Sequence, residues 1–161
     1  MFEISREVKV NAPPPAVWRV LTDFSGYRAW TKAVLVDGAP EVGCAMGYQL
    51  GWRTKSGVHR AVRFESKVNT AEPGAALIWT SGVPGILGLR FGFELRPADG
   101  GTAVRHYLQI SGVAALFRDR LTRMYGPALG AVTQDLARVL AKTRLSSLRT
   151  LPDIRRRKRK R

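Results

Sequence analysis

The 161-residue sequence is poor in the residues that form disulfides and bind metals. It has one cysteine, Cys44, and two histidines, His59 and His106. A single cysteine excludes an internal disulfide, and these three residues lack the spacing of a zinc site. The sequence also lacks a phosphate-binding loop ending in Lys-Ser/Thr and a serine nucleophile elbow. We therefore expect no metal and no cofactor, and we interpret Cys44 as a small packed side chain.

Long apolar stretches are missing as well. No window approaches the ~18 uninterrupted apolar residues of a membrane-spanning helix. The first ten residues, MFEISREVKV, lack the apolar run of a signal peptide. Together with the single cysteine, this predicts a cytoplasmic protein, either free or at a membrane surface.

Acidic residues are outnumbered, and the excess of positive charge is uneven. The chain has 27 Lys and Arg against 12 Asp and Glu, a net charge of +15. The last seven residues are all basic: Arg155, Arg156, Arg157, Lys158, Arg159, Lys160 and Arg161. The other 154 residues carry 20 Lys and Arg against the 12 acids, a net charge of +8. We predict a folded domain over 1–150 and a disordered basic tail over 151–161. The tail either binds anions such as lipid headgroups or nucleic acid, or only solubilises the chain.

The apolar pattern predicts an α+β protein. Apolar and polar residues alternate in seven segments, which cover about 2–11, 33–36, 44–52, 58–68, 75–80, 89–95 and 102–110. Two short helices are predicted between the first segment and the second, and helical periodicity covers about 114–148. Turn signals between the segments, such as Asp99-Gly100-Gly101, indicate an antiparallel meander. We expect a curved sheet of about seven strands wrapped around the long C-terminal helix, since that arrangement buries the apolar face of the helix.

Several short motifs occur in an order that points to a known family. The opening segment contains Val8, Val10, Ala12-Pro13, Val17-Trp18, Asp23-Phe24, Tyr27 and Trp30. Later motifs are Glu72-Pro73-Gly74 followed by Leu77-Ile78-Trp79, and Gly101-Thr102 followed by His106 and Ser111-Gly112. In these motifs, over roughly residues 2–147, the chain resembles the START-like superfamily, also called SRPBCC, polyketide cyclase/dehydrase-like or Bet v 1-like. The resemblance implies a helix-grip fold that encloses a pocket for an apolar ligand.

The inward strand faces and the long helix supply the residues that would line such a pocket. They are Met46, Tyr48, Trp52, Phe64, Ser66, Trp79, Phe91, Phe93, His106, Leu121 and Tyr125. A ligand cavity and a solid core are both compatible with these residue types, and the resemblance favours the cavity.

A few polar residues have two interpretations each. His106, on an inward face, is either a core histidine with one hydrogen bond or an acid–base group acting with Tyr48 or Arg6. Asp23 is expected to anchor the turn between the two short helices. The loop 81–88 is either a lid over a pocket or an ordinary hairpin loop.

Three functions are compatible with these features. The first is binding or transport of a hydrophobic small molecule, such as a lipid, an isoprenoid or a polyketide. The second is an enzyme of the aromatase/cyclase kind that uses His106. The third is an interaction module that docks to RNA or to an anionic membrane through the basic tail. We favour binding over catalysis because the sequence shows no set of catalytic groups.

Overall fold

The chain begins with the predicted strand and two short helices. A computed structural model describes residues 1–54 and 56–149. In it, β1 (Phe2–Val10) is followed by α1 (Pro14–Thr22), the 3-10 turn η1 (Phe24–Gly26) and α2 (Tyr27–Trp30). Proline fits the first turn of α1, where no intrahelical N–H is needed. The Asp23 carboxylate accepts a hydrogen bond from the Gly26 backbone N–H at 3.1 Å, which confirms its predicted role in the turn.

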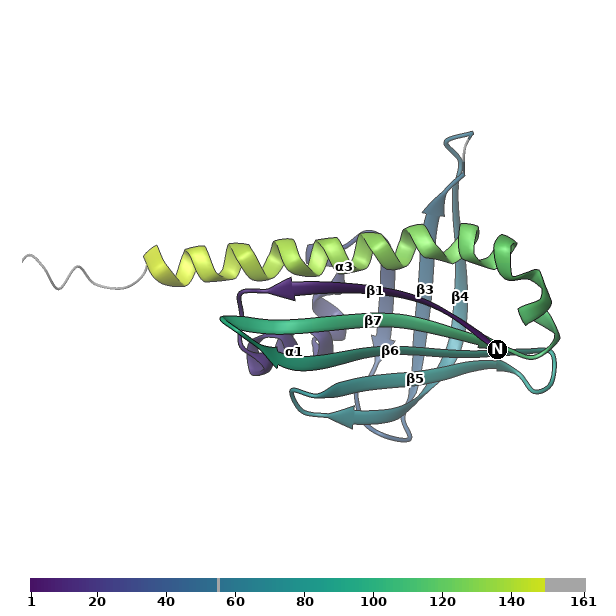
Figure 1. Cartoon of the computed structure of the whole chain (residues 1–161), viewed down its shortest axis with the longest axis horizontal. Coiled ribbons are helices and arrows are strands. Elements are labelled where there is room, and N and C mark those ends of the chain that lie inside the picture. The colour runs from purple at the N-terminus through teal and green to yellow at the C-terminus, as the bar shows by residue number, and fades with distance from the viewer. Residues whose placement is uncertain (55, 150–161) are drawn as a thin grey trace, which may run out of the picture.

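A seven-stranded antiparallel sheet follows, as predicted. Its other strands are β2 (Val34–Gly38), β3 (Ala45–Arg53), β4 (His59–Glu72), β5 (Ala76–Val83), β6 (Leu87–Ala98) and β7 (Gly101–Ser111). The strand order is β1-β7-β6-β5-β4-β3-β2. In Figure 1, β1, β7, β6 and β5 run along the long helix, whereas β3 and β4 cross it. The register of β4 shifts between Val68 and Thr70, and such a bulge bends a strand.

The sheet wraps around one long helix. After Gly112, the 3-10 turn η2 (Val113–Phe117) leads into α3 (Arg118–Arg149), which continues through Pro127. The buried positions of α3 recur every three or four residues and include Tyr125, Leu129, Val132, Leu136 and Leu140. The predicted α+β helix-grip fold is therefore confirmed.

Two further contacts involve residues of β7. The buried Thr102 hydroxyl donates a hydrogen bond to the Ala12 carbonyl at 2.7 Å, which joins β7 to the start of the helical segment. On the outer face, the Tyr107 ring covers Gly92 so closely that a Cβ at Gly92 would lie 2.6 Å from the phenol oxygen.

Some predictions fall outside what the structure describes. The basic residues 155–161 lie beyond the described range, as does the side chain of Trp52. Within the described ranges, no helix combines the length and the hydropathy needed to cross a bilayer.

Candidate functional site

The concave face of the sheet carries a row of rings that runs from β3 to β7. Tyr48 on β3 lies 5.0 Å from Trp79 on β5, measured between ring centroids. Trp79 lies 6.0 Å from Phe93 on β6, and Phe93 stacks on His106 of β7 at 4.1 Å and 11°. All four side chains are at most 1 % exposed. We call Tyr48, Trp79, Phe93 and His106 the ring row.

Further aromatic side chains join this row to the long helix. Phe91 packs against Tyr48 at 4.8 Å and stacks on Trp79 at 5.7 Å. Phe64 contacts Phe91 at 5.7 Å and Tyr125 of α3 at 6.1 Å. Because every second residue of a strand faces inward, the concave face of the sheet collects rings from the five strands β3 to β7. It forms an apolar surface between the sheet and α3.

Polar atoms within this apolar surface have no hydrogen-bond partner in the structure. They are the Tyr48 hydroxyl, the Ser66 hydroxyl, the Trp79 Nε1 and the His106 Nε2. All four belong to residues that the sequence predicted to face the interior. A buried polar group without a partner costs about 1–3 kcal/mol, so such groups are rare in native proteins.

His106 is held on one side and unpartnered on the other. Its Nδ1 lies 3.4 Å from the Thr133 hydroxyl oxygen, and that hydroxyl donates to the Leu129 carbonyl at 2.8 Å. With the Thr133 proton directed at Leu129, the Thr133 oxygen is available to accept a hydrogen bond from an Nδ1–H. This assigns the proton to Nδ1 and leaves Nε2 as a bare acceptor.

Burial lowers the pKa of His106 to about 3, and the Leu129 carbonyl partly opposes this shift. His106 is therefore neutral near pH 7. Among the described residues, no carboxylate contributes to its pKa. Burial likewise raises the pKa of the Tyr48 phenol well above its ordinary value, so Tyr48 stays a neutral donor. The site thus offers neutral hydrogen-bonding groups and no charge.

The other residues predicted to line the interior differ in their positions. Met46 is buried with the ring row, whereas Leu121 is only partly buried and packs at the margin of the core. Arg6 pairs with His106 across β1 and β7, which places it on the same face. Its side chain is nevertheless exposed at the sheet edge, where it donates to the Ser5 carbonyl at 2.8 Å. Arg6 therefore does not join the buried polar groups.

Several surface hollows lie outside the ring row, and two of them border residues of interest. One, of about 670 Å³, lies where β5 turns into β6; Ser66, Val83, Gly85 and Gly112 are part of its wall. Ser66, one of the predicted lining residues, is therefore also part of the wall of this hollow.

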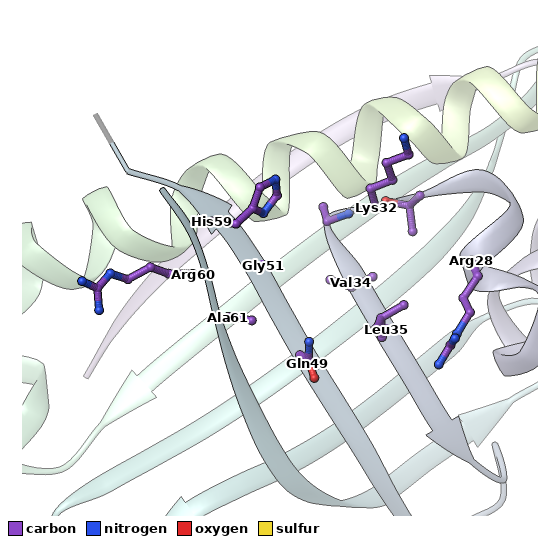
Figure 2. Close-up of a pocket in the computed structure, with 11 residues that line it drawn as sticks. Arg28, Lys32, Val34, Leu35, Gln49, Gly51, His59, Arg60 and Ala61 are labelled. Carbon is purple, nitrogen blue, oxygen red and sulfur yellow. Dashed lines mark hydrogen bonds between the residues drawn. The ribbon is translucent and has the colours of Figure 1, made fainter. Parts of the chain in front are cut away.

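Figure 2 shows the second of these hollows, of about 330 Å³, beside β2, β3 and β4. Arg28, Lys32, His59 and Arg60 line it, together with the outward-facing Gln49. Sequence reasoning missed this basic hollow. These basic residues come as two close pairs in the sequence, about 30 residues apart, and only the fold brings the two pairs together.

The described residues offer no metal centre: no group of three or more His, Cys, Asp or Glu side chains is close enough to hold an ion. Cys44 is half-buried and unpaired in the structure.

Comparison with known proteins agrees with the fold. The sequence model of the family described as "Polyketide cyclase / dehydrase and lipid transport" matches residues 1–143. None of the curated proteins compared with the chain matches it.

Solved structures share the fold at low sequence identity. Protein MLL2253 from Mesorhizobium loti is 20 % identical, with a TM-score of 0.67 over 88 % of this chain and 98 % of that one. TTHA0849 from Thermus thermophilus is 16 % identical, with a TM-score of 0.67 over 88 % and 99 %. DynU16, a putative protein in the dynemicin biosynthetic locus, is 17 % identical, with a TM-score of 0.65 over 88 % and 48 %. With a family match over residues 1–143 and the same helix-grip architecture, the chain belongs to the polyketide cyclase/dehydrase and lipid transport family.

Proposed function

We propose that the protein binds a hydrophobic small molecule of the lipid, isoprenoid or polyketide kind between its sheet and α3. The observation that carries this proposal is the set of unpartnered polar atoms in an aromatic wall. A protein that used this interior only as a core would gain stability from phenylalanine or alanine at these positions. Ligand sites, in contrast, are mostly apolar and hold a few polar groups that orient the ligand.

The polar groups also define the chemistry of the ligand. The His106 Nε2 accepts a hydrogen bond, and the Trp79 Nε1 and the Tyr48 hydroxyl donate. None of these groups is charged, since His106 is neutral at pH 7. Burying an ionised carboxylate without a cation would cost several kcal/mol. The proposed ligand is therefore a neutral apolar molecule that carries hydroxyl or carbonyl oxygens.

Binding accounts for His106 better than proton transfer does. An efficient general base has a pKa near the working pH, and the pKa of His106 lies far below it. A cyclase of this kind would also need a charged partner for His106. The group next to His106 is instead the neutral Thr133 hydroxyl, which contacts Nδ1 and leaves Nε2 as a free acceptor.

Titration with two apolar probes, followed by native mass spectrometry, tests this proposal on the full-length chain. Farnesol is neutral and carries a hydroxyl, whereas palmitic acid is ionised at pH 7. We expect farnesol to bind more tightly. Tyr48→Phe and His106→Phe keep a ring in place but remove a polar group, and each should weaken farnesol binding about three- to tenfold.

Tyr27→Phe is the matched control. Tyr27 is also a buried tyrosine, but its hydroxyl already donates to the Leu21 carbonyl at 2.9 Å. This variant should bind farnesol like the parent protein. If neither probe binds, and extraction of the protein purified from its host releases no apolar molecule, the proposal is wrong. Equal affinities for Tyr48→Phe, His106→Phe and Tyr27→Phe would place the ligand elsewhere.

A further inference from the structure

Large apolar side chains are exposed together at one end of the molecule. Val83 and Ile86 lie in the β5–β6 hairpin, and Val113, Leu116 and Phe117 lie in η2. Their exposed fractions range from 55 % for Val83 to 82 % for Leu116. We call these five residues the apolar tip.

Backbone hydrogen bonds join the β5–β6 hairpin to η2, although the two segments are about 30 residues apart in sequence. The Ala114 N–H donates to the Ile86 carbonyl at 2.9 Å, and the Val113 N–H donates to the Gly85 carbonyl at 3.2 Å. Gly112 permits this approach, because it has a φ of +81° and a Cβ there would lie 2.7 Å from the Ile86 carbonyl oxygen. In Figure 1 this end of the sheet is the one that carries the N-terminus. The apolar tip is therefore a built surface and not a set of scattered side chains.

The charges next to the apolar tip are mostly positive. Residues 81–90 and 111–123 contain four arginines, Arg90, Arg118, Arg120 and Arg123, and one acid, Asp119. Arg118 and Arg120 lie in the first turn of α3, directly after Leu116 and Phe117 of η2. The Arg118 guanidinium lies over the Phe2 ring, 5.7 Å from its centroid. Exposed apolar side chains with arginines beside them match a membrane interface, where the acyl region is apolar and the headgroups are anionic.

We propose that the apolar tip docks onto a bilayer that carries anionic headgroups. The apolar side chains enter the headgroup–acyl boundary, and the arginines contact the headgroups. The hollow walled by Ser66, Val83 and Gly112 borders the apolar tip, so docking brings this hollow to the bilayer. Docking itself needs no bound ligand and stands apart from the proposed ligand site.

Cosedimentation of the full-length chain with cargo-free vesicles tests the proposal. Vesicles of phosphatidylcholine alone are compared with vesicles that also contain phosphatidylserine, and we expect stronger binding to the second kind. Leu116→Ser and Phe117→Ser should each weaken binding about tenfold. Arg120→Ser should weaken it about fivefold at low salt.

Val42→Ser is the matched control for the apolar substitutions. Val42 is 64 % exposed, close to the 61 % of Phe117, but it lies between β2 and β3. This variant should bind vesicles like the parent chain. Circular dichroism and thermal unfolding of each variant establish that the fold is intact, as expected for exposed positions.

A depth measurement separates docking by the apolar tip from attachment by the basic residues 155–161. Brominated acyl chains should quench the added fluorescence of Phe117→Trp but not that of Val42→Trp. Vesicle binding without this quenching, or binding that survives Leu116→Ser and Phe117→Ser, would assign attachment to the basic residues and overturn the proposal. A third outcome would also overturn the proposal. If the parent chain binds no vesicles but self-associates, and Leu116→Ser and Phe117→Ser abolish this self-association, the apolar tip is a protein interface.

Discussion

Because the Tyr48 hydroxyl has no partner, we predict that removing it stabilises the ligand-free protein. Tyr48 is 1 % exposed, and its ring packs against Trp79 and Phe91. Tyr48→Phe removes the hydroxyl and keeps these ring contacts. A buried donor without a partner costs about 1–3 kcal/mol, so we expect the free energy of unfolding of the ligand-free protein to rise by about 1 kcal/mol. For a chain of this size, that change raises Tm by about 2–4 °C.

The same substitution at Tyr27 should have the opposite effect. Tyr27 is also buried, but Tyr27→Phe breaks its hydrogen bond and leaves the Leu21 carbonyl, near the end of α1, without that donor. We expect the free energy of unfolding to fall by about 1 kcal/mol. The two tyrosine variants should therefore differ by about 2 kcal/mol, although each loses only one oxygen.

Urea unfolding of the ligand-free protein, followed by circular dichroism and tryptophan fluorescence, measures both changes. Equal m-values would show that the substitutions alter stability and not the compactness of the unfolded state. If Tyr48→Phe destabilises the protein as much as Tyr27→Phe does, then the Tyr48 hydroxyl has a partner in solution. The argument from unpartnered polar groups would then fail, and with it the main support for the ligand site.

Three further outcomes are expected. The pKa of His106 is lowered to about 3 from 6.5, so the unfolded state binds the proton more readily. Stability should therefore fall as pH drops from about 6.5 toward 3, by at most about 1.4 kcal/mol per pH unit. His106→Phe should flatten this part of a curve of stability against pH. Thr102→Val should lower the free energy of unfolding in urea by about 1–2 kcal/mol, because the Ala12 carbonyl loses its buried donor; no change would mean that another group replaces the hydroxyl. Gly92→Ala should lower the free energy of unfolding in urea by about 1–3 kcal/mol, because the new Cβ collides with the Tyr107 ring. Adding Tyr107→Ala should remove most of that collision.

Side-chain alternation predicted most of the sheet but not the ends of its strands. The segment 81–88 reads as a loop because it has three glycines and a proline. In the structure β5 extends to Val83 and β6 begins at Leu87, with Gly82 paired to Gly88. Backbone pairing needs no side chain, so a glycine-rich strand end carries no signal in an apolar pattern.

For the candidate site, the sequence predicted which side chains face inward but not which of their polar atoms have partners. Alternation places Tyr48, Ser66, Trp79 and His106 on the inward face, and the structure agrees. Whether an inward polar atom has a partner depends on what lies opposite it. The neighbour of His106 is Thr133, 27 residues further along the chain. No local pattern contains that information.

The sequence by itself determined the order of the elements, the two faces of each strand and the apolar face of the long helix, because these follow from side-chain period along the chain. Only the tertiary structure decided which polar atoms of the interior lack partners, that Arg6 stays exposed at the sheet edge, and that the β5–β6 hairpin and η2 form one apolar tip. These features depend on contacts between residues far apart in sequence, and such contacts exist only once the sheet has closed around α3.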